Sequence, residues 1–438
     1  MPKRPINADV PAPEGGEPKE TPPERQKPPR QKSGTPKALA ALVVLALAFI
    51  AAAIVFGSGS DGGEDSASST PAPAPAPPVD DAASGDADAP SAPTAELGYP
   101  TFATNNTVRI GGSDPVANAA GAALAVFPST SAEQRPSAVT VVGEEDWAGA
   151  ISAAVLMASP VRSPILFSSP DELPEASEEA LAALDPQGSE TTGGAPLFAV
   201  GTVAYPGEAA PVDSGDPAGT AAQIANLRDR LFGKPPQHIV VASSARPDFA
   251  MPAAAWAARS GDPVLYSETD ELPAATAGFL EQHPKVPVFV LGPNEVISKD
   301  VLQEIGRISK RVKRVAGEDP VANAIALARY RDGDFGWNIN DPGHGFVLAR
   351  SDSPANAAAA APLSASGTWG PLLLTDDAAT VPPELRNYLL DVKPGYTDDP
   401  TRAFYNHVWV IGDEDAISVE QQAEVDALAE LAKIGGER

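Results

Sequence analysis

Aromatic, amide and imidazole side chains that suit sugar recognition gather in two segments near the end of the chain. The first reads FGWNINDPGHG at 335–345, and the second reads PGYTDDPTRAFYNHVW at 394–409. Aromatic residues make up only 6% of the chain, so this clustering is unusual. Rings can stack on sugars while polar side chains bond their hydroxyl groups. The candidate ligand-binding residues are Trp337, His344, Tyr396, Arg402, Tyr405, Asn406 and His407.

A purely structural role is the alternative for these segments, which would then pack on each other and close the end of the fold. The sequence shows no convincing catalytic or metal-binding pattern. Its four His residues are far apart and lack metal-ligand spacing. It has no Cys, which excludes disulfides, thiolate metal sites and a Cys nucleophile. A nucleophile elbow and a phosphate-binding Gly-rich loop are absent too, so we expect no catalytic residue, metal or cofactor.

The opening of a repeated unit supplies a second group of candidates. The chain reads RIGGSDPVANA at 109–119 and RVAGEDPVANA at 314–324, with the shorter GDPAGTA between them. The Asp residues of the three copies are 102 and 103 residues apart. Each copy continues with a Pro-led apolar run (PILF, PVLY or PLLL) and closes with LFAVG, VFVLG or VWVIG. Three ordered landmarks that recur three times indicate tandem repeats.

A helix that begins behind a Gly-containing turn can bind an anion at its N-terminus. The Asp in each opening would compete with an anion, and it is more simply a helix cap. Arg109 and Arg314 can contact a ligand there, or pair with a carboxylate across a junction between units. The candidate ligand-binding residues of the openings are Arg109, Asn118, Arg314 and Asn323.

Short apolar runs alternate with Ala-rich stretches in each unit. In the first copy we expect strands at 108–110, 139–142, 164–167 and 197–200, and helices at 115–126, 147–158 and 175–184. Such alternation is typical of a parallel sheet that helices cover on both faces. We therefore expect an α/β fold of three Rossmann-like parallel-sheet modules around a pseudo-threefold axis. The expected modules span 97–205, 206–312 and 313–438.

Three further segments precede the repeats. Residues 1–37 carry eight Lys or Arg and five Asp or Glu but few large apolar residues, so we expect a disordered cytoplasmic tail. The nineteen residues at 38–56 are apolar and match the thickness of a bilayer. Because basic residues precede them, we expect a single transmembrane helix with a cytoplasmic N-terminus; a cleaved signal peptide is the alternative. Residues 57–96 form a linker rich in Pro, Ala, Ser and Asp.

The repeat resembles the cell-wall-binding repeat family of type 2, found in surface proteins of Gram-positive bacteria. Members open with Arg-Ile-x-Gly-x-Asp and close with Val-x-Val-x-Gly-Gly, and the landmarks above follow this order over 97–431. This chain departs from the family where Pro-Val replaces the usual Arg-Tyr and where Asn118 and Asn323 replace a Thr. The resemblance implies three diverged tandem copies that bind an anionic wall polymer non-covalently.

Charge limits the choice of partner. The net charge of -27 argues against nucleic-acid binding. From Leu97 onward, 23 Lys or Arg stand against 45 Asp or Glu, a balance that repels polyanions at long range. We expect a cell-membrane protein, held in the lipid bilayer by 38–56, whose exterior part binds a cell-wall polymer or glycan. The second hypothesis is an exterior solute- or signal-binding domain, and the third is an enzyme that processes wall glycans.

Overall fold

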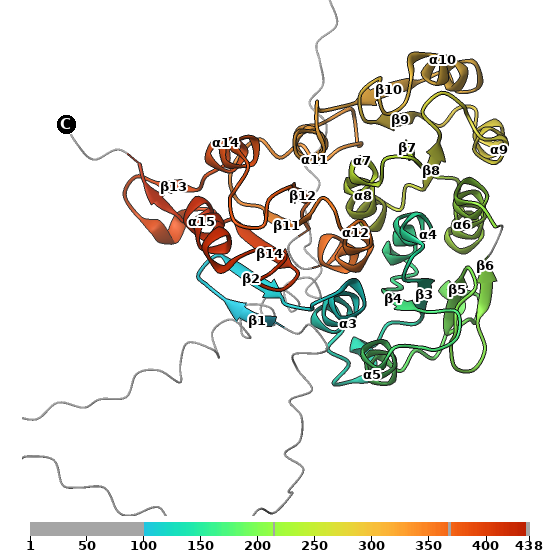
Figure 1. Ribbon diagram of the computed structural model, residues 1–438, viewed down its shortest axis with the longest axis horizontal. Helices are drawn as coiled ribbons and strands as arrows, with labels where there is room; N and C mark the ends of the chain where they lie inside the picture. Colours follow the sequence, from blue (N-terminus) through green and yellow to red (C-terminus); the bar gives the residue numbers. More distant parts are fainter. Residues whose placement is uncertain (1–99, 213–214, 367–368, 435–438) are drawn as a thin grey trace, which may run out of the picture. The chain divides into compact units, whose positions relative to one another are not determined.

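The computed structural model describes residues 100–212, 215–366 and 369–434. The predicted tail, the predicted transmembrane helix at 38–56 and the linker lie outside these residues. Within the described part of the chain, no helix is both long and apolar enough to cross a bilayer. Strands and helices alternate through it (Figure 1), which confirms the expectation of an α/β fold with parallel sheets.

Three sheets contain most of the strands of the described residues. Their strand orders are β4-β3-β5-β6, β8-β7-β9-β10 and β12-β11-β14-β2. All of these neighbours are parallel, and β1 (Pro100–Ala103) adds an antiparallel edge beside β2. The strands are β2 (Thr107–Ile110), β3 (Val139–Gly143), β4 (Ile165–Ser168), β5 (Leu197–Val200), β6 (Ala210–Val212), β7 (Ile239–Ser243), β8 (Val264–Ser267), β9 (Val288–Leu291), β10 (Val312–Val315), β11 (Gly345–Arg350), β12 (Leu372–Thr375) and β14 (His407–Ile411).

The strand that opens each repeat pairs with the last strand of another repeat. β6 lies just before the second opening and β10 runs into the third, yet they pair with β5 and β9 of the preceding sheets. β2 opens the first repeat and pairs with β14, with Arg109 opposite Val410 and Ile110 opposite Ile411. The chain thus closes on itself, because its first repeat supplies a strand of the sheet that its last repeat builds.

The helix after each opening strand packs on the following sheet instead. These helices are α3 (Pro115–Val126), α6 (Pro217–Phe232) and α11 (Pro320–Arg329), and they contact β4, β8 and β12. Each starts at a Pro, and the side chain of the Asp before it accepts from a backbone N–H at 2.8 or 2.9 Å. Capping of this kind satisfies donors at a helix start, which confirms the expected role of the three Asp residues.

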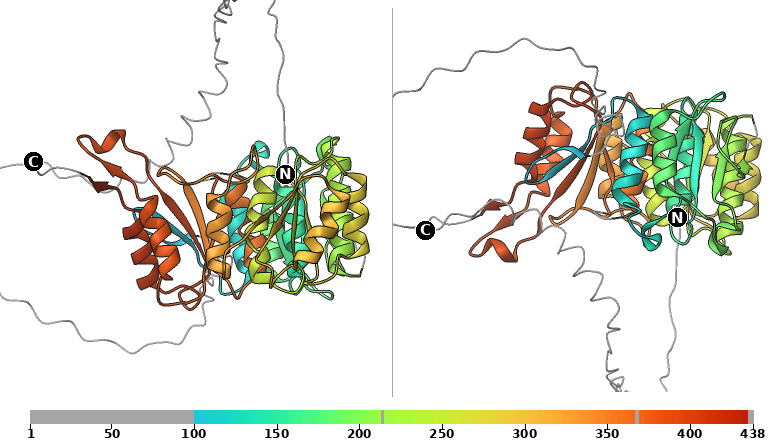
Figure 2. Two further views of the ribbon diagram at one scale, coloured as in Figure 1. Left: turned by 90° about the horizontal axis from the view of Figure 1, so that it is seen from above. Right: turned by 90° about the horizontal axis from the view of Figure 1, so that it is seen from below.

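The remaining helices cover the two faces of the sheets. The Ala-rich α4 (Trp147–Ala153), α8 (Pro252–Ser260) and α12 (Ala355–Ala359) contact one another in the middle of Figure 1. On the other face lie α5 (Glu175–Leu184), α9 (Ala274–Gln282) and α14 (Pro383–Asp391). There α10 (Lys299–Ile308) follows β9 and α15 (Val419–Ala429) follows β14, and Figure 2 shows α14 and α15 together beside the third sheet. No helix lies between β5 and β6, whose connecting residues are all described.

Arg109 fixes the closure between β2 and β14. Its side chain is buried, and its terminal nitrogens donate to the backbone oxygens of Gly412, Asp413 and Ile417 at 2.8, 2.6 and 2.7 Å. Its Nε donates to the side chain of Gln422 on α15 at 2.8 Å. Burial lowers the pKa of the Arg109 guanidinium, and nearby carboxylates oppose this effect. The interaction therefore ties the strand to the loop and helix that follow its partner strand.

The second sheet repeats this arrangement, and the first does not. Arg314 on β10 donates to four backbone oxygens between Gly292 and Ser298, at 2.5 to 3.3 Å. Burial also lowers the pKa of Arg314. On β6 the corresponding position, opposite Ala199, holds Pro211. A Pro cannot make such contacts, and the first sheet also lacks the helix that they would hold.

We expect Arg109→Ala to lower the free energy of unfolding by about 3 kcal/mol, because the change leaves buried carbonyl oxygens without donors. Denaturant titration measures this loss, and hydrogen exchange should show faster opening at 407–411. Arg135→Ala is the control, since Arg135 pairs with Asp185 at the surface, where such pairs contribute about 0–1 kcal/mol. Equal stability of the two variants would contradict the assigned role of Arg109.

Candidate functional site

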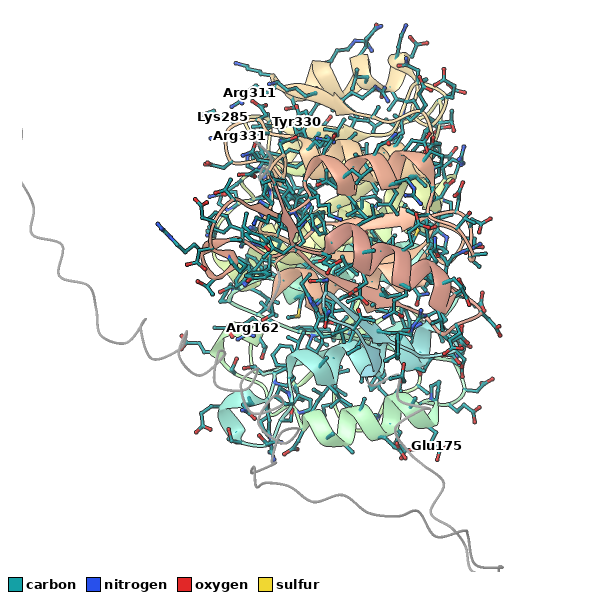
Figure 3. All side chains as sticks on the ribbon, turned by 90° about the vertical axis from the view of Figure 1, so that its left-hand side faces the viewer. Arg162, Glu175, Lys285, Arg311, Tyr330 and Arg331 are labelled. Atoms are coloured by element: carbon teal, nitrogen blue, oxygen red, sulfur yellow. The ribbon has the colours of Figure 1, made fainter. Side chains whose placement is uncertain are left out.

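A basic patch lies at the amino ends of β9 and β10. The two strands are parallel, with Lys313 opposite Phe289, so the residues that precede them meet at one edge of the second sheet. Figure 3 shows the side chains of Lys285, Arg311 and Arg331 close together beside Tyr330. The basic patch comprises five exposed residues, Lys285, Lys310, Arg311, Lys313 and Arg331.

Asp332 balances only part of this positive charge. Its carboxylate lies 2.7 Å from Nζ of Lys313 and 3.9 Å from the guanidinium of Arg311. The hydrogen bond from Lys313 lowers the pKa of Asp332, as do the neighbouring positive charges. No carboxylate of the described residues forms an ion pair with the other three members of the patch. These members can therefore bind phosphate or carboxylate groups of a ligand.

The candidate residues of the repeat openings hold the backbone together. Asn118 accepts from the N–H of Gly112 at 3.0 Å and donates to the side chain of Asn356 at 3.2 Å. Asn323 accepts from the N–H of Gly317 at 3.3 Å and donates to a carbonyl of α7 (Pro247–Ala250) at 3.3 Å. Both Asn side chains are buried. Like the two Arg residues, they stabilise the turns between the opening strands and their helices.

A crevice lies at the carboxyl ends of β2, β14 and β11, where an open α/β sheet commonly binds ligands. It includes a cavity of about 200 Å³ and a neighbouring one of about 350 Å³. Arg350 donates twice to Asp352, at 3.2 and 2.6 Å, which lowers the pKa of that carboxyl. The lining carboxylates are those of Asp114, Glu144, Glu145, Asp352 and Asp415. This crevice does not suit a polyanion, and nowhere in the described chain do three or more acidic or His side chains form a metal site.

The two aromatic segments of the third repeat meet at Asn406. Because β11 and β14 are parallel neighbours, the residues before them come together. The side chain of Asn406 accepts from the N–H groups of Gly343 and His344 at 2.9 and 3.1 Å. It also donates to the carbonyl of Val392 at 2.8 Å. Asn406 is buried, so its part in the structure is to join the segments.

The other candidates of these segments occupy different surroundings. Trp337 and His344 line a cavity beside Trp256 of α8. Tyr396 lies on β13 (Gly395–Tyr396), which pairs with β15 (Ala432–Lys433). The hydroxyl of Tyr405 donates to the carbonyl of Pro400 at 2.9 Å, and its ring is exposed. The last two candidates are Arg402 in a 3₁₀ turn and His407, whose ring packs edge-on against Trp409.

The sequence alone does not reveal the basic patch or the two Trp residues, Trp256 and Trp369, that lie near Trp337. A signal for the patch was present, because KRVKR at 310–314 is a dense basic run in an acidic chain. Lys285 and Arg331 are distant in sequence, and only the pairing of β9 with β10 and the return of the chain after α11 bring them to that run. Trp256 and Trp369 stand alone in Ala-rich and Gly-containing stretches, which gave no signal.

Comparison with known proteins shows a family match in two segments of the chain and a similar fold in solved structures. Residues 213–302 and 314–422 match the family model described as cell wall binding domain 2. The structure resembles Cwp6 from Clostridium difficile, with a TM-score of 0.60 and 18% identity over 75% of this chain and 50% of that one. It also resembles Cwp8 from Clostridium difficile, with a TM-score of 0.56 and 19% identity over 74% of this chain and 52% of that one. This chain thus spans about half of each protein. No curated protein sequence matches it.

His407 should make the stability of the fold depend on pH. Burial lowers the pKa of its imidazole, and the charge of Asp426 opposes this effect only in part. The unfolded chain therefore binds a proton more readily than the folded chain, and stability should fall as the pH drops below about 6.5. We expect this slope to be smaller in His407→Gln than in the unchanged chain. Denaturant titrations of both chains between about pH 5 and 8 measure it, and equal slopes in the two chains would contradict the role of His407.

Proposed function

Because residues 213–302 and 314–422 belong to the cell wall binding domain 2 family, we propose that this chain attaches to the cell wall by binding a wall polymer non-covalently. The polymer would be anionic, as in the relatives that the repeat resembles. The observation that carries this choice is the basic patch, which comprises five exposed cationic side chains on a chain with a net charge of -27. Binding at the wall implies that the repeats lie outside the cytoplasm.

The patch would let an acidic chain bind an anionic ligand. Long-range repulsion falls off within about 10 Å at 0.1 M salt, whereas direct contacts remain. Lys313 lies on a strand, and Arg311 and Lys285 flank strands, so the sheet holds their backbones at fixed spacing. Phe335, close to Arg331 in sequence, stacks on Phe289 with ring centroids 3.6 Å apart. A group of cations held by the sheet suits the closely spaced anionic groups of a polymer.

We assign the three sheets to three repeat modules, with each opening strand exchanged into the preceding sheet. Family matches in two tandem segments and the third set of landmarks at 109–201 support this assignment. We also propose that residues 38–56 anchor the chain in the membrane with a cytoplasmic N-terminus. Their hydrophobicity and the basic residues before them support the anchor. The modules would then be held between the membrane and the wall.

Reversing two charges of the patch tests the polymer site. We expect Lys285→Glu combined with Arg331→Glu to weaken binding to purified cell walls about tenfold or more, since each cation near an anionic surface contributes about 1 kcal/mol. Sedimentation of the full-length chain with walls measures the affinity. Binding should also weaken as salt rises from about 0.05 to 0.5 M.

Arg135→Glu combined with Arg162→Glu is the matched control. It changes the net charge equally, and Figure 3 places Arg162 away from the patch. Equal weakening by both double variants would mean that net charge alone matters. If the patch variant still binds walls tightly at all salt concentrations, the basic patch is not the polymer site. If the unchanged chain does not bind walls, the proposed function is wrong.

Membrane attachment needs its own test. We expect the full-length chain to stay with membranes after alkaline carbonate extraction, and a chain that starts at Ser58 to be released. Lysine-specific protease added to intact, wall-free cells should digest the repeats and spare the tail. An N-terminus of the mature protein close to Ser58 would show that the apolar run is a cleaved signal peptide.

A further inference from the structure

A pocket lined by three of the five Trp residues of the chain lies between the second and third sheets. It has a volume of about 420 Å³, within the range of small-ligand sites. Trp256 comes from α8, Trp337 from the segment after α11, and Trp369 from the residues before β12. The rings of Trp256 and Trp337 pack edge to face, with centroids 5.6 Å apart.

The backbone at Trp369 has a strained conformation, and the ring of this residue faces the pocket. Its φ is 54°, in the left-handed region that residues with a side chain rarely adopt. The next residue is Gly370, where a Cβ atom would come within 1.8 Å of the carbonyl oxygen of Gly345. The chain therefore passes directly over the start of β11 and cannot relax there. Strain held in this manner is common at ligand sites.

The ring of Trp369 remains open to a ligand. Its side chain is 51% exposed, although the guanidinium of Arg259 lies 4.3 Å from the ring centroid. No side chain or backbone oxygen of the described residues accepts a hydrogen bond from Arg259, which is itself exposed. An exposed aromatic ring and a cation with unused donors, fixed beside each other, can bind the apolar face and the hydroxyl groups of one sugar.

The pocket wall behind Trp369 is rigid and polar. The buried carboxylate of Asp262 accepts from Nε1 of Trp256 at 3.0 Å and lies 3.1 Å from Nδ1 of His238, which fixes the indole. Nε1 of Trp337 is buried and has no partner in the described structure, and a buried donor in this state is destabilising. A ligand oxygen that accepts from it after a small shift of the ring would recover that loss.

We propose that this pocket binds one neutral sugar ring of the wall glycan, stacked on Trp369 and bordered by Trp337. A neutral ring fits better than an anionic one, because the carboxylates of Asp262 and Asp334 line the pocket together with a single Arg, Arg259. The inference rests on the proposed function and adds a second contact to it. The segment after α11 carries both Arg331 of the basic patch and Trp337, so one polymer can contact patch and pocket.

The test uses the full-length chain and a soluble probe, the tetramer of N-acetylglucosamine. We expect the tetramer to quench tryptophan fluorescence, and calorimetry to show affinity at least about tenfold weaker for Trp369→Ala, the scale of a lost aromatic contact. Tyr205→Ala is the matched control, since Tyr205 is also partly exposed, at 38%, and lies before β6. If Trp369→Ala lowers the melting temperature, Arg259→Gln decides instead and should lose affinity several-fold.

The outcomes separate the pocket from the wall-binding function. The proposed pocket would be overturned if the unchanged chain does not bind the tetramer. It would also be overturned if Trp369→Ala and Arg259→Gln both bind the tetramer as tightly as the unchanged chain does. In that case Trp369→Ala and Arg259→Gln should still sediment with complete walls, because the basic patch alone would bind the polymer. The reversed-charge variant of the patch should keep its affinity for the neutral tetramer, and loss of that affinity would show that patch and pocket do not act separately.

Discussion

Hydrogen bonds between β2 and β14 join the first described strands to the sheet that the end of the chain builds. The same exchange joins β6 to the first sheet and β10 to the second, so no repeat completes its own sheet. Each opening strand pairs with one sheet while the helix after it packs on the next. The turn between strand and helix therefore holds two sheets together, and the buried Arg and Asn side chains concentrate at these turns.

These turns explain why the polar residues of the openings resemble ligand contacts when only the sequence is considered. In the sequence, an Arg before a Gly-containing turn and an Asn within a helix look available for binding. In the structure, Arg109, Arg314, Asn118 and Asn323 satisfy backbone groups that the strand exchange leaves inside the fold. The oxygen and amide groups that these side chains contact in the structure belong mainly to the protein's own backbone.

The sequence predicts the local elements of the first repeat well. The expected helices at 115–126 and 175–184 match α3 and α5, and the expected strand at 197–200 matches β5. Capping residues and apolar runs act over a few residues, so the sequence alone displays them. Strand exchange and the meeting of Trp256, Trp337 and Trp369 depend on contacts between distant residues. No local pattern encodes such contacts. The sequence shows only the basic run of the patch at 310–314, because Lys285 and Arg331 join that run through strand pairing and the return of the chain after α11.

The exchanged strand also determines how a mechanical pull would spread through the fold. A force applied at residue 100 would first peel β1 from β2, because the two strands run antiparallel. The next resistance would come from β2, whose bonds to the parallel β14 would be loaded along the strand rather than opened one by one. The hydrogen bonds of Arg109 to the loop after β14 would resist the pull at the same point. Through its contacts with β4, α3 would transmit the remaining force to the first sheet. Traction at one end would thus be shared between the first and last repeats instead of unravelling them in order.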